Sequence, residues 1–174
     1  MRFAPRTRKI ALIAHIVAMS AWIGLDLALG VLVLTAVSTG NPAAYQAAHL
    51  IGVWPMLIAS LLTLATGILL GLGTRYGLIR YWWVAVKLAV NVLMSALLYF
   101  SLRPGLYTAA EYGRRLAAGD TAAQPPEQLL YPIFVAPALL LFAVVLAVVK
   151  PWGRLSRRGD PAQARRNLGR RGPV

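Results

Sequence analysis

Four ionisable side chains interrupt long apolar stretches of this sequence: His15, Asp26, His49 and Lys87. An Asp, Lys or Arg inside a bilayer costs about 2.5–3.5 kcal/mol on insertion scales, so each such residue requires a reason for being there. A neutral imidazole is a good ligand for iron or copper. A lysine ammonium group can hold an anion or donate a proton. These residue types therefore predict metal or cofactor ligation beside a cationic group.

The elements that position these side chains are four apolar spans. The chain has 174 residues and is 59% hydrophobic, which a soluble domain of this size could not cover. Runs of about 20 nearly uncharged residues match the length that crosses a bilayer. We expect spans at about residues 10–37, 44–72, 81–102 and 129–149. The sequence thus predicts an all-α transmembrane four-helix bundle over residues 1–153, followed by a basic, disordered tail over residues 154–174.

The distribution of Lys and Arg predicts the orientation of the bundle. Four precede the first span, two lie in the second connector and eight follow the fourth span, against three in the third connector. Because basic residues stay on the cytoplasmic side, both termini are expected in the cytoplasm, with the chain in the cytoplasmic (inner) membrane. The net charge of +13 is then explained by anionic lipid head groups, and nucleic-acid binding is not expected.

The third connector is expected outside the membrane. The third span should end before Arg103-Pro104-Gly105, and a short surface helix is predicted over residues 108–118, where Glu111 and Arg115 stand four residues apart. Aromatic residues near the predicted span ends are typical of an interfacial belt. They are Trp22, Trp54, Tyr81, Trp82, Trp83, Tyr99, Tyr131 and Trp152.

Helical rise places the four polar side chains at two depths. At ~1.5 Å per residue, His15 lies about 8 Å and Lys87 about 9 Å from the cytoplasmic edge. Asp26 lies about 24 Å from that edge, and His49 lies about 7 Å below the outer face, so these two are level. The sequence therefore predicts two polar tiers, His15 with Lys87 and Asp26 with His49.

Each of the first three spans gathers polar and sulfur-containing residues on one face at 100° per residue. The three stripes are His15, Met19, Trp22 and Asp26; His49, Met56, Ser60, Thr63 and Gly67; and Lys87, Asn91, Met94 and Ser95. The fourth span carries no strong polar residue between Tyr131 and Lys150 and is expected to serve in packing.

Structural roles also account for these residues. Lys87 could snorkel to the cytoplasmic interface, and His15 could donate to a backbone carbonyl of a neighbouring helix. Asp26 and His49 could form a hydrogen-bonded pair that only joins two helices, and the methionines could be flexible core filler. Both interpretations stay open on the sequence alone.

The functional interpretation is a cofactor held between facing helices. For haem b, His15 is the first candidate as axial metal ligand, with His49 as the alternative. One haem bridging both is disfavoured, because their estimated depths differ by about 15 Å. Lys87 is the candidate catalytic residue, which could pair with a haem propionate, bind an anionic substrate or donate a proton. Copper is the alternative metal, because three methionines near mid-membrane suit Cu(I): Met19, Met56 and Met94.

Three short motifs resemble those of known membrane families. The first is His-x6-Trp-x-Gly, formed by His15, Trp22 and Gly24. The second is Pro-Met with a later Gly, formed by Pro55, Met56 and Gly67. The third is Trp-x3-Lys-Leu, formed by Trp83, Lys87 and Leu88. The first resembles CopD-type copper-resistance domains and HemJ-type protoporphyrinogen oxidases, and the others are similar to the HemJ pattern. The resemblance covers residues 9–103 and departs from HemJ over residues 25–30. It implies a membrane four-helix bundle and, for HemJ, a b-type haem with an important His and Lys, which would be His15 and Lys87.

The leading hypothesis is a haem-binding redox protein that exchanges electrons with a quinone or a porphyrin-like partner. The alternatives are copper or small-solute transport along the His, Met and Asp stripes, and a non-catalytic assembly subunit. Membrane oxidoreductase activity and homo-oligomer formation are left open. The sequence contains no Walker loop, Ser–His–Asp constellation or Gly-rich dinucleotide loop, so nucleotide hydrolysis and soluble hydrolase chemistry are not expected.

Overall fold

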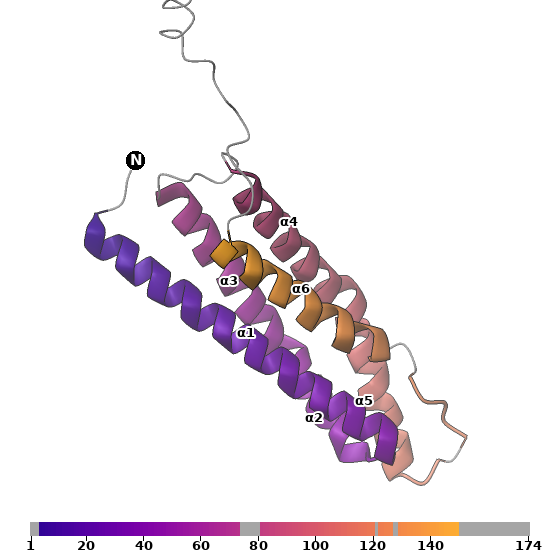
Figure 1. The fold of residues 1–174 in the computed structure, drawn as a ribbon. Coiled ribbons are helices and arrows are strands. Elements are labelled where there is room, and N and C mark those ends of the chain that lie inside the picture. The colour runs from indigo at the N-terminus through magenta and orange to yellow at the C-terminus, as the bar shows by residue number, and fades with distance from the viewer. Residues whose placement is uncertain (1–3, 74–80, 121, 127–128, 150–174) are drawn as a thin grey trace, which may run out of the picture.

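The computed structural model describes residues 4–73, 81–120, 122–126 and 129–149, and among these residues it contains helices but no strand. Four helical rods are long and apolar enough to cross a membrane: Pro5–Thr39, Pro42–Gly73, Trp82–Ala117 and Leu130–Val149. They lie side by side as a bundle (Figure 1). The predicted all-α four-helix bundle is confirmed. The predicted tail over residues 154–174 and the basic residues Arg75 and Arg80 lie outside the described residues.

Large apolar side chains cover the outside of the bundle. Val31 and Leu141 are each 65% exposed and Val148 is 76% exposed, and residues of this kind occur on all four rods. Leaving apolar surface in water costs roughly 25 cal/mol per Å², whereas contact with lipid tails carries no such cost. The surface therefore faces lipid, and the chain is an integral, multi-pass membrane protein.

A short turn at Gly40 and Asn41 separates the first two spans, and the helix on each side of it is capped. Helix α1 (Pro5–Thr39) ends where Gly40 adopts a left-handed φ of 64° and donates to the carbonyl of Ala36 at 2.9 Å. The side chain of Asn41 then accepts a hydrogen bond from the N–H of Ala43 at 2.9 Å, with Pro42 in the first helical position. The break predicted at Gly40-Asn41-Pro42 is therefore confirmed.

The second span, predicted as one helix, consists of two. Helices α2 (Pro42–Gly52) and α3 (Trp54–Gly73) are separated at Val53, whose φ of −86° and ψ of −80° are not helical. Pro55 explains this break, because it has no N–H to donate and its ring crowds the carbonyl one turn earlier. As a result α2 packs against α5 as well as α1, while α3 packs along α1.

The third span runs on past its predicted end. Helix α4 (Trp82–Leu97) continues through a π-helical segment, η1 (Leu98–Leu102), into α5 (Arg103–Ala117), and the three form one rod in Figure 1. The prediction that the helix ends before Arg103-Pro104-Gly105 is wrong. The wider π-helical turn precedes Pro104 and accommodates the missing N–H without breaking the rod. The helix expected at residues 108–118 exists, but it belongs to this rod and packs against α2 instead of lying alone on the surface.

Helix α6 (Leu130–Val149) closes the bundle within one residue of its predicted limits. It packs against α1 and α4 and buries Ile133, Leu140 and Leu146, as expected for a packing helix.

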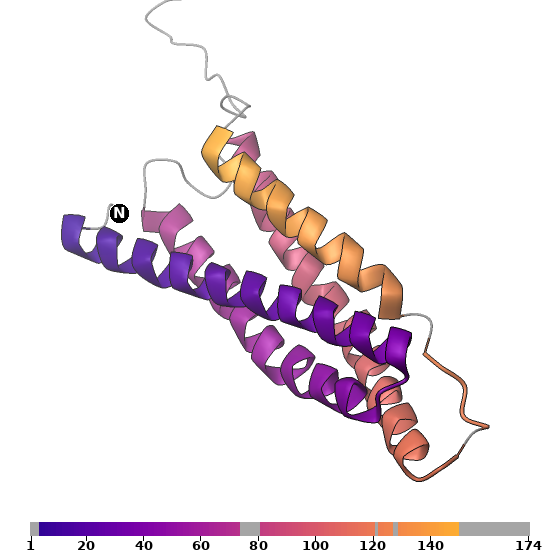
Figure 2. The ribbon, with the colours of Figure 1, turned by 60° about the horizontal axis from the view of Figure 1, so that its bottom comes forward.

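The two halves of the bundle are packed differently. No residue of the stretches 5–17 of α1 and 82–93 of α4 is buried, whereas the core gathers toward the α5 end around Trp22, Leu29 and Leu106. Figure 2 shows the pair α1 and α3 diverging from the pair α4 and α6 toward the end where the chain begins. We call residues 5–17, 64–73, 82–93 and 141–149 the terminal half.

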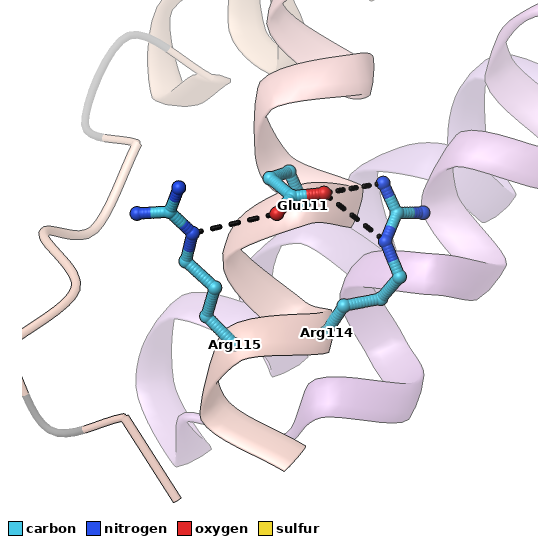
Figure 3. A network of polar contacts seen from close by, with 3 residues as sticks. All are labelled: Glu111, Arg114 and Arg115. Atoms are coloured by element: carbon cyan, nitrogen blue, oxygen red, sulfur yellow. Dashed lines mark hydrogen bonds and ion pairs between the residues drawn. The ribbon is translucent and has the colours of Figure 1, made fainter. Parts of the chain in front are cut away.

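An exposed ion-pair network lies near the end of α5 (Figure 3). Glu111 accepts hydrogen bonds from Arg114 at 2.6 and 3.1 Å and from Arg115 at 3.4 Å. The predicted pair Glu111–Arg115 is confirmed, and Arg114 is the closer partner. Because all three side chains are exposed, the network contributes little to stability.

The packing of α5 on α2 yields a test. A Cβ at Gly113 would lie 2.9 Å from the carbonyl oxygen of Pro42 and 3.0 Å from the Cβ of Tyr45, so Gly113→Ala must push the helices apart. We expect a loss of about 1–3 kcal/mol, measured as a lower apparent melting temperature in detergent. Gly24→Ala is the matched control, because no atom lies within 4 Å of a Cβ there, and it should leave the temperature unchanged or raise it. Equal effects of both substitutions would contradict this packing.

Candidate functional site

His15 packs into the interface between α1 and α3. Its Nδ1 lies 2.9 Å from the Thr66 hydroxyl, and its ring lies against Gly67, where a Cβ would stand 3.3 Å from the ring carbon Cε1. Gly67 is the residue that the resemblance selected in the second span. Its missing side chain leaves room for the imidazole, so a glycine at this position of the pattern has a steric reason.

The hydrogen bonds of Thr66 favour one tautomer of the imidazole. A hydroxyl has one proton, and the Thr66 Oγ1 lies 2.6 Å from the carbonyl oxygen of Leu62 and 3.2 Å from that of Thr63. When the hydroxyl donates to one of these carbonyls, its oxygen accepts from His15, and the imidazole proton is then on Nδ1. In the neutral ring the lone pair of Nε2 is then left to accept a hydrogen bond or bind a metal. The donation to a neighbouring helix that the sequence also allowed has two acceptors on α3, the Thr66 hydroxyl and the backbone of Thr63.

The charge of Lys87 on α4 acts on the imidazole of His15 on α1, and the predicted tier of these two residues stays a prediction. Lys87 is half-buried. Within the part of the chain that the structure describes, Lys87 forms no ion pair. One turn further along α4, the buried Oδ1 of Asn91 has no hydrogen-bond partner. The terminal half of the bundle thus contains an imidazole, an ammonium group and an unpaired amide oxygen.

The second predicted tier does not form a bonded pair. Asp26 is 5% exposed and its Oδ2 has no hydrogen-bond partner, and the Nε2 of His49 has none either. The His49 ring instead meets Tyr107 of α5 edge to face, with ring centroids 4.6 Å apart. The two predicted haem ligands also lie far apart, since Thr66, the partner of His15, follows His49 by about 25 Å of helical rise. One haem cannot bridge both histidines.

Arg103 is a feature that sequence reasoning missed. Its guanidinium lies 5.1–5.7 Å from the centroids of three aromatic rings, those of Trp54, Tyr99 and Tyr107. Such cation–π contacts stabilise a cation near a membrane surface. Two of these rings were expected at the same membrane face as Arg103, but Tyr107 can join them only because α5 continues the rod.

A cavity of about 340 Å³ lies between α1, α3, the α4–η1 rod and α6. Met56 and Met94 line it together, whereas Met19 does not. Trp22 also lines it and is only 1% exposed, so its ring lies inside the bundle. Within residues 4–73, 81–120, 122–126 and 129–149, no three His, Cys, Asp or Glu side chains gather as a metal site.

Comparison with protein-family models, curated proteins and solved structures found no match to the chain. The resemblance to CopD-type and HemJ-type proteins therefore stays a prediction from the motif residues. Of its two functional candidates, Lys87 acts electrostatically on His15.

The unpaired carboxyl group of Asp26 yields a second test. A buried polar group without a partner costs about 1–3 kcal/mol, so Asp26→Leu should raise the apparent melting temperature in detergent. Ser20→Leu is the control on the exposed side of the same helix and should change it little. A lower melting temperature for Asp26→Leu would show that this carboxyl group has a stabilising partner.

Proposed function

We propose that this protein is a haem-binding redox protein of the cytoplasmic membrane, with His15 as the axial ligand of haem b. The observation that carries the proposal is the hydrogen bond between His15 Nδ1 and Thr66, which leaves Nε2 to a second partner. A histidine that ligates a metal typically donates its other ring N–H to a second group in this way. The same bond fixes the ring orientation and favours the tautomer that ligation needs.

The charge near His15 fits that of haem. Haem b carries anionic propionates, and Lys87 is a nearby cation without an acidic partner among the described residues. Residues 5–17 and 82–93 include no buried residue, so these two segments are the ones least occupied by packing within the chain itself. Bound there, haem would supply one-electron oxidation and reduction.

The chain's own residues have distinct parts in this proposal. Thr66 orients the imidazole, and Gly67 gives the ring its place against α3. Lys87 offers its Nζ to a propionate or to an anionic substrate. The apolar residues around them exclude water, which strengthens these charge interactions. Membrane oxidoreductase activity, with a quinone or porphyrin-like electron partner, belongs to the same proposal.

Copper transport is the second candidate, favoured by the shared cavity of Met56 and Met94. Thioethers suit Cu(I), but Met19 lies outside the lining and the chain has no cysteine. The cavity therefore offers only two sulfur ligands. Haem at His15 is the leading proposal, because the hydrogen bond to Thr66 defines its donor better. The non-catalytic assembly role and the homo-oligomer stay predictions.

The haem proposal is tested by the absorption spectrum of protein produced with haem supplied and purified in detergent. A Soret band is expected, which disappears in His15→Ala and persists in the control His49→Ala. Thr66→Val should weaken haem binding about 10–100-fold, because it removes the group that orients the ligand. Lys87→Gln should weaken binding while keeping the axial ligation spectrum. A colourless wild-type preparation, or loss of the band only in His49→Ala, would contradict the assignment.

The proposed orientation is tested by labelling single cysteines, since the chain has none of its own. Thr7 and Ala118 are exposed near opposite ends of the bundle. With both termini in the cytoplasm, a membrane-impermeant maleimide should label Ala118→Cys in cells with an accessible inner membrane, and Thr7→Cys only after lysis. The reverse pattern would show that the positive-inside assignment is wrong.

A further inference from the structure

The cavity near the middle of the bundle is separate from the His15 site. Trp22 and Met56 form its deep wall at 1% exposure each, and Met94 lies beside them at 6%. Toward the surface it is bordered by Leu97, 44% exposed, and Tyr131, 76% exposed. The cavity therefore opens between the α4–η1 rod and α6 onto the lipid-facing surface, and a ligand would enter from the membrane.

Trp22, a residue of the deep wall, carries a buried hydrogen-bond donor without a partner. The indole Nε1 of Trp22 is buried and makes no hydrogen bond. An indole N–H can only donate, and the hydrocarbon core of a bilayer provides no water to accept from it. A ligand that satisfies this group must bring its own acceptor, which a hydrocarbon chain lacks.

A π-helical segment builds one side of the cavity. Leu98, Ser101 and Leu102 of η1 line it, and they come from the turn that accommodates Pro104. Single π-helical turns inside α-helices frequently occur at functional sites. The thioethers of Met56 and Met94 make favourable contacts with aromatic and similar flat rings, so the walls suit a ring better than a branched group.

We propose that this cavity binds the ring of a lipid-soluble quinone, with one quinone carbonyl oxygen accepting a hydrogen bond from Trp22 Nε1. A quinone combines the required properties: solubility in lipid, a flat ring, and carbonyl acceptors. The volume of about 340 Å³ lies within the range of small-molecule sites. The redox role of the quinone rests on the proposed function, whereas its binding does not.

Binding is measured on haem-free protein in detergent micelles with ¹⁵N-labelled tryptophan, so the result does not depend on the haem proposal. The chain has five tryptophans, and Trp22→Phe identifies the indole N–H resonance of Trp22. Decylubiquinone should move this resonance downfield in a saturable way, as a new hydrogen bond requires. Dodecylbenzene, which has a ring and a chain but no carbonyl, should not. If saturating decylubiquinone leaves the resonance in place, the proposal is wrong.

Two variants test the same site through affinity for decylubiquinone. Trp22→Phe keeps a ring and removes the donor, and about tenfold weaker binding is expected. Ala136→Phe places a ring in the cavity and should abolish binding, whereas Ala138→Phe, on an exposed position of the same helix, is the matched control and should bind as the wild type does. Unchanged affinity in Trp22→Phe, or competition by dodecylbenzene at equal strength, would identify an acyl-chain site and overturn the proposal.

Discussion

The absence of water inside the spans is the constraint on which this structure depends. In hydrocarbon every backbone and side-chain polar group must find its partner within the protein or in a ligand. Most do so locally: Ser60 donates to the carbonyl of Leu57, and Thr63 to that of Ala59. The exceptions among the described residues are five buried atoms, on Trp22, Asp26, His49, Asn91 and Ser95. Two of them lie at the proposed sites: Trp22 lines the cavity, and Asn91 lies one turn from Lys87.

Two prolines shape the tightly packed end of the bundle, opposite the terminal half. Pro55 breaks the second span at Val53, which lets α2 turn to pack against α5. Pro104 follows a π-helical segment, so the third span continues far enough for α5 to reach α2. The close approach of Gly113 to Pro42 holds these helices together. The tight packing at this end contrasts with the terminal half, where polar residues lie among helices that bury little.

One face of α1 connects the two proposed sites. His15 and Trp22 stand seven residues apart, close to two helical turns, so they point the same way at a separation of about 10 Å along the axis. His15 faces α3 through Thr66 and Gly67, while Trp22 reaches the cavity bordered by η1 and α6. A lipid-soluble electron partner and a haem would thus be held by a single rigid helix at a fixed spacing. This arrangement would link their chemistry without requiring a change in the fold.

The sequence by itself determined the all-α bundle and the approximate spans. Hydropathy and helical rise are local properties, so they can be obtained from neighbouring residues along one chain. Only the tertiary structure decided that Thr66 orients His15, that Tyr107 contacts His49 in place of Asp26, and that Trp22 lines a cavity. Those contacts depend on how each helix is rotated and where it is broken. Val53 and η1 set that geometry through the prolines that follow them, and a periodic pattern carries no information on the resulting partners across helices.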